Sequence, residues 1–148
     1  MDKSIYPIAL ASDHAGFFLK EIIRKFLEKN GFIVEDYGTY SDARTDYPDH
    51  VHPLAAALEL GQHQTGIVIC GSGNGVSMTA NKHRGVRAAL CWKPEIARLA
   101  RAHNDANVLA LPARFIDEET ALEALTLFLN TPFEGGRHVQ RVNKIPVK

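Results

Sequence analysis

Residues 66–70, with the sequence GIVIC, form an apolar run in which no polar residue alternates with the apolar ones. A strand with one face in water would alternate, so a continuous run predicts a strand that is covered on both faces. The glycine-rich segment 71–75 follows directly and ends the strand. The chain is therefore expected to contain a parallel sheet with helices packed on both of its faces.

Further apolar segments alternate with amphipathic ones along the chain. Within residues 13–29, Leu19 and Ile23 follow the helical period, and Lys20 and Glu28 belong to the polar positions that we assign to the solvent face. We expect strands at 6–11, 32–37, 66–70, 86–91 and 107–111, and helices at 13–29, 52–60, 94–103 and 117–129, with one more after residue 75. This order predicts an α/β fold, a Rossmann-like three-layer sandwich with a five-stranded parallel sheet.

The bulk composition limits the class of protein. The 148 residues, 45% of them hydrophobic, suit one domain over residues 1–148. Seventeen Lys and Arg balance seventeen Asp and Glu, so no overall field attracts nucleic acid. No apolar run approaches the roughly 20 residues of a membrane helix, and the first residues lack a signal-peptide pattern, so we expect a cytoplasmic protein without a membrane partner. The only two cysteines do not suggest a disulfide framework.

Reactive side chains follow several expected strands at the same end. Asp13 and His14 come after the first strand, and Cys70 closes the third. Because the carboxyl ends of parallel strands meet at one edge, these side chains are expected to share a crevice. Cys70 adjoins the segment 71–75, whose N–H groups can point at an anion, and is a candidate nucleophile or base. The alternatives are an inert buried cysteine, which is our interpretation of Cys91, and a helix cap for Asp13.

Two other places can carry chemistry. His103, followed by Asn104, lies near the end of an expected helix, where an imidazole gains a proton readily, unless it is only a solvated helix end. Arg137 and Arg141 share one side of a helical turn and suit a phosphate clamp, with Arg114 as a third donor, or else form a solvated basic tail. The histidines at 50, 52, 63 and 83 lack supporting ligand spacing, so no metal site is expected.

Five motifs, in order, span almost the whole chain: SDHAGF at 12–17, RTDYPD at 44–49, ICGSGNGVSMTANK at 69–82, HNDANVLALPAR at 103–114 and EGGRHVQRV at 134–142. Together they resemble the type B ribose-5-phosphate isomerases, within a sugar-phosphate isomerase family that also includes galactose-6-phosphate isomerase subunits. The resemblance implies interconversion of D-ribose 5-phosphate and D-ribulose 5-phosphate, a step of the non-oxidative pentose phosphate pathway.

The resemblance also implies a role for each matching residue. Cys70 would move the proton between C2 and C1 through an enediolate, and Ser72 and the loop N–H groups would stabilise its charge. His103 would open the furanose ring, with Asp13 assisting around the sugar oxygens. His14 and the three arginines would hold the phosphate, and Asn104 the sugar hydroxyls. The implied substrate-binding set is His14, Tyr47, Gly71, Gly73, Asn74, Gly75, Asn104, Arg114, Arg137 and Arg141. No metal or organic cofactor is implied.

The resemblance also implies a homodimer, because members of this family form homodimers. A tetramer of two such dimers is the alternative. Their sites combine the strand-end residues of one subunit with the HND and GGRH segments of the other, so residues 134–148 would serve the dimer and the partner's site. Two alternatives stay open. One is the same chemistry on a six-carbon sugar phosphate, such as allose 6-phosphate or galactose 6-phosphate. The other is a non-catalytic sugar-phosphate-binding module, which would need the glycine loop and the arginines but not Cys70 or His103.

Overall fold

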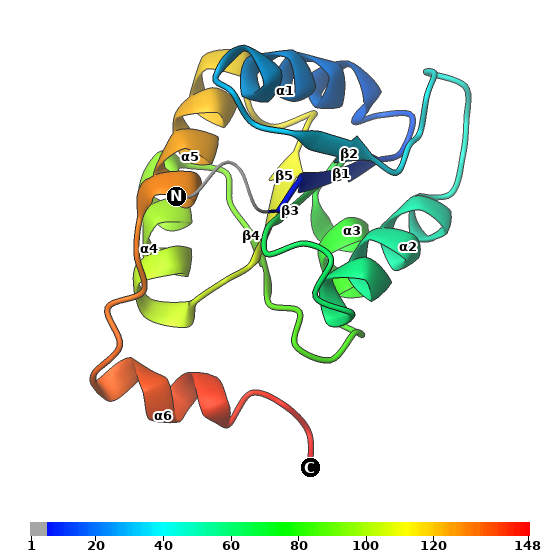
Figure 1. The fold of residues 1–148 in the computed structure, drawn as a ribbon. Helices are drawn as coiled ribbons and strands as arrows, with labels where there is room; N and C mark the ends of the chain where they lie inside the picture. Colours follow the sequence, from blue (N-terminus) through cyan, green and yellow to red (C-terminus); the bar gives the residue numbers. More distant parts are fainter. Residues whose placement is uncertain (1–5) are drawn as a thin grey trace.

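Parallel strands form a single sheet at the centre of the computed structural model, which describes residues 6–148 (Figure 1). The five strands, in the spatial order β2-β1-β3-β5-β4, are β1 (Ile8–Ser12), β2 (Val34–Asp36), β3 (Gly66–Cys70), β4 (Ala88–Leu90) and β5 (Val108–Pro112). Every neighbouring pair in this part of the chain is parallel. The predicted fold class is confirmed.

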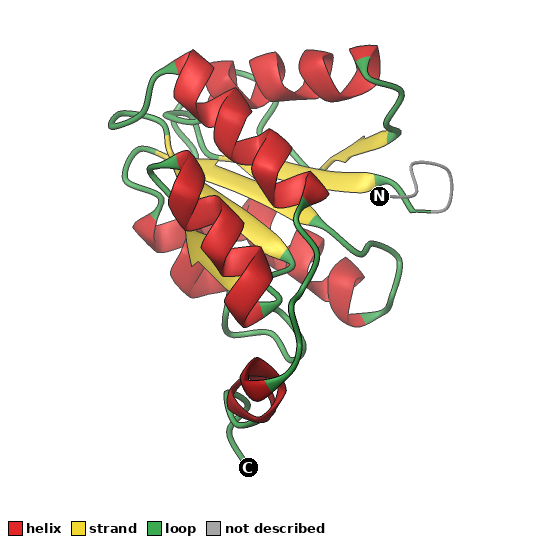
Figure 2. Ribbon diagram, turned by 90° about the vertical axis from the view of Figure 1, so that its left-hand side faces the viewer, coloured by secondary structure: helices red, strands yellow, loops and turns green. Residues whose placement is uncertain are grey.

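Helices cover both faces of the sheet (Figure 2). The described helices are α1 (Phe17–Lys29), α2 (Tyr47–Glu59), α3 (Asn74–Ala80), α4 (Pro94–Asn104), α5 (Glu118–Asn130) and α6 (Arg137–Asn143). Helices α1, α4 and α5 contribute to one buried cluster, and α2 and α3 to the other. None of the helices in residues 6–148 is long and apolar enough to span a bilayer.

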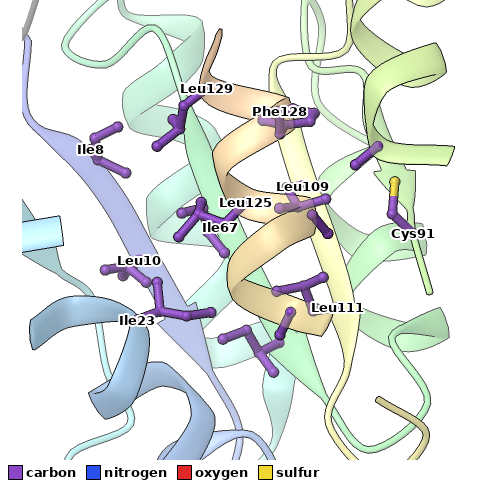
Figure 3. Packing of buried hydrophobic residues seen from close by; sticks show 14 of the residues in the cluster. Ile8, Leu10, Ile23, Ile67, Cys91, Leu109, Leu111, Leu125, Phe128 and Leu129 are labelled. Atoms are coloured by element: carbon purple, nitrogen blue, oxygen red, sulfur yellow. The ribbon is translucent and has the colours of Figure 1, made fainter. Parts of the chain in front are cut away.

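The two apolar clusters explain the continuous apolar run of the central strands. Ile67 and Ile69 of β3 face the cluster with α1 and α5, whereas Val68 faces the cluster with α2. Figure 3 shows Ile67 together with Leu125 of α5 in the first cluster. Because successive side chains point to opposite faces, a strand buried on both sides has no position for a polar residue. All five residues of β3 are buried, as the sequence predicted.

Two helix starts differ from the prediction. Helix α1 begins at Phe17 rather than 13, because residues 13–16 form a turn in which the Asp13 carboxylate accepts the N–H of Gly16 over 3.1 Å. Helix α2 begins at Tyr47 rather than 52. Pro48 lies in its first turn, where the fixed φ of proline fits a helix and its missing N–H leaves no bond unmade. The polar loop before α2 is therefore shorter than expected.

Lys20 was assigned to the solvent face of α1, and this prediction is wrong. Its side chain is fully buried, and Nζ lies 2.5 Å from a carboxylate oxygen of Asp36. The ammonium also lies 5.6 Å from the ring centre of Phe17 and 5.7 Å from that of Tyr40. Asp36 accepts the N–H of Gly38 as well, so this buried ion pair holds the start of the loop that leads to α2.

The topology places a switch point between β1 and β3. From β1 the chain moves outward to β2, and from β3 it moves to the opposite side, where β5 and β4 lie. Ligands of doubly wound α/β proteins bind at the carboxyl ends of the strands beside such a point. Asp13 follows β1 and Cys70 ends β3, so both lie at this position.

Candidate active site

Cys70 is the centre of the site at the strand ends. It is the last residue of β3 and is only 5% exposed, and its Sγ accepts the backbone N–H of Gly73 over 3.2 Å. Ser72 lies at the exposed surface of the loop, where its Oγ accepts the N–H of Asn74. Gly73 has a φ of +75°, and a Cβ there would lie 2.3 Å from the side chain of Leu90. The loop thus closes around the sulfur only with glycine at this position.

Asp13 and His14 border the loop from β1. The backbone N–H of Asp13 donates to Ile69 O, which places the 7% exposed Asp13 beside the end of β3. Its carboxylate accepts the N–H of Gly16 in the turn before α1, but the N-cap of α1 is Gly16 and has no side-chain cap, so the helix-cap interpretation of Asp13 is wrong. His14 Nδ1 lies 3.3 Å from both the backbone N and O of Thr45, which anchors the loop before α2 to the strand end.

Tyr47 and Arg114 border the glycine loop from two other elements. A Cβ placed on Gly75 would lie 2.7 Å from the Tyr47 hydroxyl, and a Cβ on Gly71 would lie 3.2 Å from both Cδ and Nη1 of Arg114. The N–H of Arg114 also donates to the carbonyl of Gly71. We call this set the strand-end cluster: Asp13, His14, Tyr47, Cys70, Gly71, Ser72, Gly73, Asn74, Gly75 and Arg114.

A second group lies where α4 ends and α6 begins. The rings of His103 and His138 stack, with their centres 4.4 Å apart and an angle of 13° between their planes. Their Nε2 atoms lie 3.8 Å and 3.7 Å from one carboxylate oxygen of Glu134. Burial, the neighbouring His103 and the guanidinium of Arg137 lower the pKa of His138 below its usual 6.5. We call His103, Glu134 and His138 the imidazole cluster.

Asn104, Arg137 and Arg141 adjoin the imidazole cluster. Asn104 ends α4, and both arginines lie on α6 with exposed side chains. The N–H of Glu134 donates to the carbonyl of Ala102, which fixes the segment before α6 against the end of α4 (Figure 1). The predicted helical spacing of the two arginines is confirmed.

The strand-end cluster lies at the carboxyl ends of the strands, and the imidazole cluster lies at their amino ends. Helix α4 follows β4 and therefore starts at the carboxyl ends of the strands. It runs back antiparallel to them, so its last residues, His103 and Asn104, lie at the amino ends. A single chain therefore does not bring Cys70 and His103 together. The sequence alone had suggested that Arg114 joins Arg137 and Arg141 in one phosphate clamp. Within a single chain, Arg114 does not lie near these two residues.

Sequence reasoning assigned no role to Glu134 or His138. No helical spacing could have found them, because Glu134 lies in the segment before α6 and only His138 belongs to that helix. Cys91 behaves as interpreted: it is fully buried, and burial raises the pKa of its thiol to about 12.

A parallel sheet with a thiol, a carboxylate and a tight glycine loop at its switch point defines a doubly wound α/β protein with a small-ligand site at its strand ends. The family model described as Ribose/Galactose Isomerase matches residues 8–145. The chain belongs to this ribose/galactose isomerase family.

Similar proteins cover nearly the same length. The chain is 46% identical over 138 residues to ribose-5-phosphate isomerase B of Escherichia coli, covering 93% of each sequence. The crystal structure of a ribose 5-phosphate isomerase from Thermotoga maritima is 49% identical, with a TM-score of 0.92 and coverage of 95% and 97%. That of ribose-5-phosphate isomerase B from Mycoplasma genitalium, with bound ribulose-5-phosphate, is 44% identical, with a TM-score of 0.90 and coverage of 95% and 93%.

Proposed function

We propose that this protein is an aldose-ketose isomerase that interconverts D-ribose 5-phosphate and D-ribulose 5-phosphate. The observation that carries the proposal is the position of the Cys70 sulfur, at the switch point and under the N–H of Gly73. Relatives named ribose-5-phosphate isomerase B, and a relative's structure with bound ribulose-5-phosphate, support this choice of sugar. A cytoplasmic role in pentose phosphate metabolism goes with it.

The proposed chemistry is a proton shuttle by Cys70. The thiolate takes the proton from C2 of the open-chain aldose, the electrons of the broken C–H bond form the C1–C2 double bond, and the carbonyl oxygen O1 becomes an enediolate oxygen. The thiol then returns the proton to C1 while the hydroxyl proton on O2 moves to O1, so that C2 becomes the ketone and O1 becomes a hydroxyl. A positioned base of this kind contributes typically about 10²–10⁴ in rate.

The glycine loop supplies the electrostatic part of the proposal. Negative charge develops on the enediolate oxygen, and preorganised N–H and hydroxyl donors stabilise such charge more than they stabilise the neutral substrate. We assign this role to the N–H groups of the loop 71–75 and to the hydroxyl of Ser72, which lies at the exposed surface of the loop. The described residues supply base and donors, so no cofactor enters the proposal.

Ring opening and phosphate binding require the second group, so we propose that two copies share each site. His103 opens the furanose, with Asp13 assisting at the sugar oxygens, and Asn104 binds hydroxyls. Arg137 and Arg141 of one copy meet His14 and Arg114 of the other around the phosphate. The remaining residues of the strand-end cluster, Tyr47 and the loop residues 71–75, contact the rest of the sugar.

Exposed apolar side chains near both clusters support the pairing. Met78 of α3, Phe115 after β5 and Val139 of α6 are 66%, 74% and 42% exposed. Exposed apolar surface of this kind is typical of protein–protein contacts. In a homodimer the same surface occurs twice, so each copy gives one half of two identical sites.

The substrate is tested by incubating the purified protein with ribose 5-phosphate in the presence of a chelator and following ribulose 5-phosphate. Allose 6-phosphate and galactose 6-phosphate are run in parallel. We expect fast, chelator-resistant conversion of the pentose. Turnover of a hexose phosphate alone would keep the mechanism and change the substrate, and tight binding without any turnover would support a binding module instead.

Shared sites are tested by mixing two inactive variants. In a mixed dimer of Cys70→Ala and His103→Gln chains, one site has both changes and the other has neither. Random pairing should restore about one quarter of the wild-type activity. If the site lay within one chain, the mixture would stay inactive. Co-expression with two different tags allows the mixed dimer to be isolated.

A further inference from the structure

The imidazole cluster has the composition of a metal site. Within residues 6–148 it is the one group of at least three His, Cys, Asp or Glu side chains whose ligand atoms all lie within 4.8 Å of one another. Two imidazoles and a carboxylate are a common ligand set for Zn²⁺, with a fourth position left for water. Its members come from the end of α4, the segment before α6 and α6 itself.

We propose that His103, Glu134 and His138 bind a borderline transition-metal cation such as Zn²⁺, and that the bound metal inhibits the enzyme. Bonds of about 2.0–2.2 Å in a tetrahedral site place ligand atoms roughly 3.3–3.6 Å apart. The observed separations from the Glu134 oxygen are 3.8 Å to His103 Nε2 and 3.7 Å to His138 Nε2. A contraction of less than about half an ångström therefore brings these pairs to coordination distance.

The cluster combines one fixed ligand with two that can move. The His138 side chain is 10% exposed, whereas those of His103 and Glu134 are 40% and 53% exposed. The stacked rings must open so that both lone pairs point at one ion, and the exposed His103 ring can make that rotation. The backbone bond from Glu134 N to Ala102 O already holds the two segments together at 3.0 Å.

The charges and ligand types around the imidazole cluster determine how tightly it should bind a metal and which metals it should prefer. Glu134 offsets part of the ion's charge, but Arg137 and Arg141 lie on the same short helix and oppose a cation. We therefore expect weaker binding than at a structural zinc site. Imidazole ligands favour Zn²⁺, Co²⁺ and Ni²⁺ over hard cations, so Mg²⁺ should not compete.

Inhibition follows from the identity of one ligand, and this part rests on the proposed function. A metal on Nε2 of His103 occupies the lone pair that ring opening needs. The metal-free protein is then the active form, and a chelator activates a metal-loaded sample. Binding of the metal itself does not depend on the proposed function.

The binding test uses Co²⁺, whose tetrahedral complexes absorb visible light strongly, with the purified full-length protein. We expect saturable absorption at one Co²⁺ per chain, displaced by Zn²⁺ and not by Mg²⁺. Glu134→Gln and His138→Gln should each weaken binding at least about tenfold. Glu134 is exposed, so its replacement leaves folding intact and keeps the test valid even if the buried His138 variant misfolds.

Two controls remove competing ligands. His52 Nδ1 lies 2.7 Å from His83 Nε2, and His83 Nδ1 lies 2.6 Å from Glu59, so the double variant His52→Gln/His83→Gln removes the other imidazole pair. Cys70→Ala removes the thiol. Both should bind Co²⁺ as the wild type does. Loss of absorption in either control, with wild-type binding in Glu134→Gln, would overturn the proposal.

An activity test then separates the two parts. Zn²⁺ should reduce turnover of ribose 5-phosphate, a chelator should restore it, and Glu134→Gln should need at least about tenfold more Zn²⁺ for the same fractional loss. Co²⁺ binding with unchanged turnover would overturn the inhibition and leave the site. A protein that converts no sugar phosphate would refute the proposed function, while the absorption titration would still decide the metal site.

Discussion

The backbone N–H of Gly73 donates a hydrogen bond to the sulfur of Cys70 across 3.2 Å. This bond fixes the side chain at the bottom of the glycine loop and directs a donor at the atom that is proposed to take the proton from the substrate. A hydrogen bond to an ionised acceptor is roughly twice as strong as a neutral one. The loop therefore positions Cys70 and places a hydrogen-bond donor beside its sulfur.

Replacing Cys70 by alanine should abolish isomerisation while binding remains. The base is lost, and a positioned base is worth about 10²–10⁴ in rate, but the phosphate ligands stay in place. Turnover is measured by ribulose 5-phosphate formation and binding by calorimetry with ribose 5-phosphate. Cys91→Ala is the matched control, since Cys91 is fully buried in the core and should not affect turnover. Wild-type turnover in Cys70→Ala would exclude Cys70 as the base.

Arg137→Ala should weaken substrate binding more than it slows turnover. A hydrogen bond to a charged group contributes about 1.5–3 kcal/mol, which corresponds to an increase of KM by roughly 10- to 150-fold. Arg24→Ala is the control, because Arg24 pairs with Glu21 and Glu28 on the surface of α1. Steady-state kinetics on both variants give the answer, and an unchanged KM in Arg137→Ala would contradict the phosphate assignment.

Gly16→Ala should destabilise the fold by about 2 kcal/mol, as overpacking commonly does. A Cβ at this position would lie 2.6 Å from the carbonyl oxygen of Ile69, and a backbone atom of the central strand cannot move aside cheaply. Gly85→Ala is informative beside it, because position 85 is open but has a φ of +75°. That variant reports backbone strain alone, at roughly 1–2 kcal/mol. Urea unfolding measures both, and wild-type stability of Gly16→Ala would refute the close approach.

The free energy of unfolding should fall steeply between pH 10 and pH 12. Burial, with the nearby charge of Glu35, raises the pKa of Tyr37 from 10.0 to about 12. In this window the unfolded chain has lost the phenolic proton and the folded chain keeps it, so rising pH favours unfolding. Tyr37→Phe should show a shallower decline. The Cys91 thiol titrates in both proteins, so the difference between their slopes reports Tyr37, and identical slopes would contradict its assignment.

Periodicity and alternation predicted the parts of the fold that one segment determines by itself. Residues 66–70 match β3 at both ends, and Pro94 and Asp117 mark the starts of α4 and α5, where Asp117 accepts the N–H of Thr120. The burial of Lys20 could not be predicted, because it depends on Asp36, which lies sixteen residues further along. A helical pattern describes only one helix and not the loop that covers it.

The residues of the candidate site also fall into those that the sequence could predict and those that it could not. The strand-end rule found Asp13 and Cys70, because parallel strands bring their ends to one edge whatever the loops contain. The contact between His103 and His138 joins residues that are distant in the chain, and it exists only because α6 returns to the end of α4. No local pattern specifies that return, so Glu134 and His138 emerged only from the structure.

The distance across the sheet between the strand-end cluster and the imidazole cluster changes what a kinetic experiment reports. If each site forms only between two copies, turnover measures assembly as much as chemistry. Specific activity should then decline on dilution, even though every chain keeps its fold. A substitution at the pairing surface that touches neither cluster would lower the rate and be mistaken for damage to the catalytic groups.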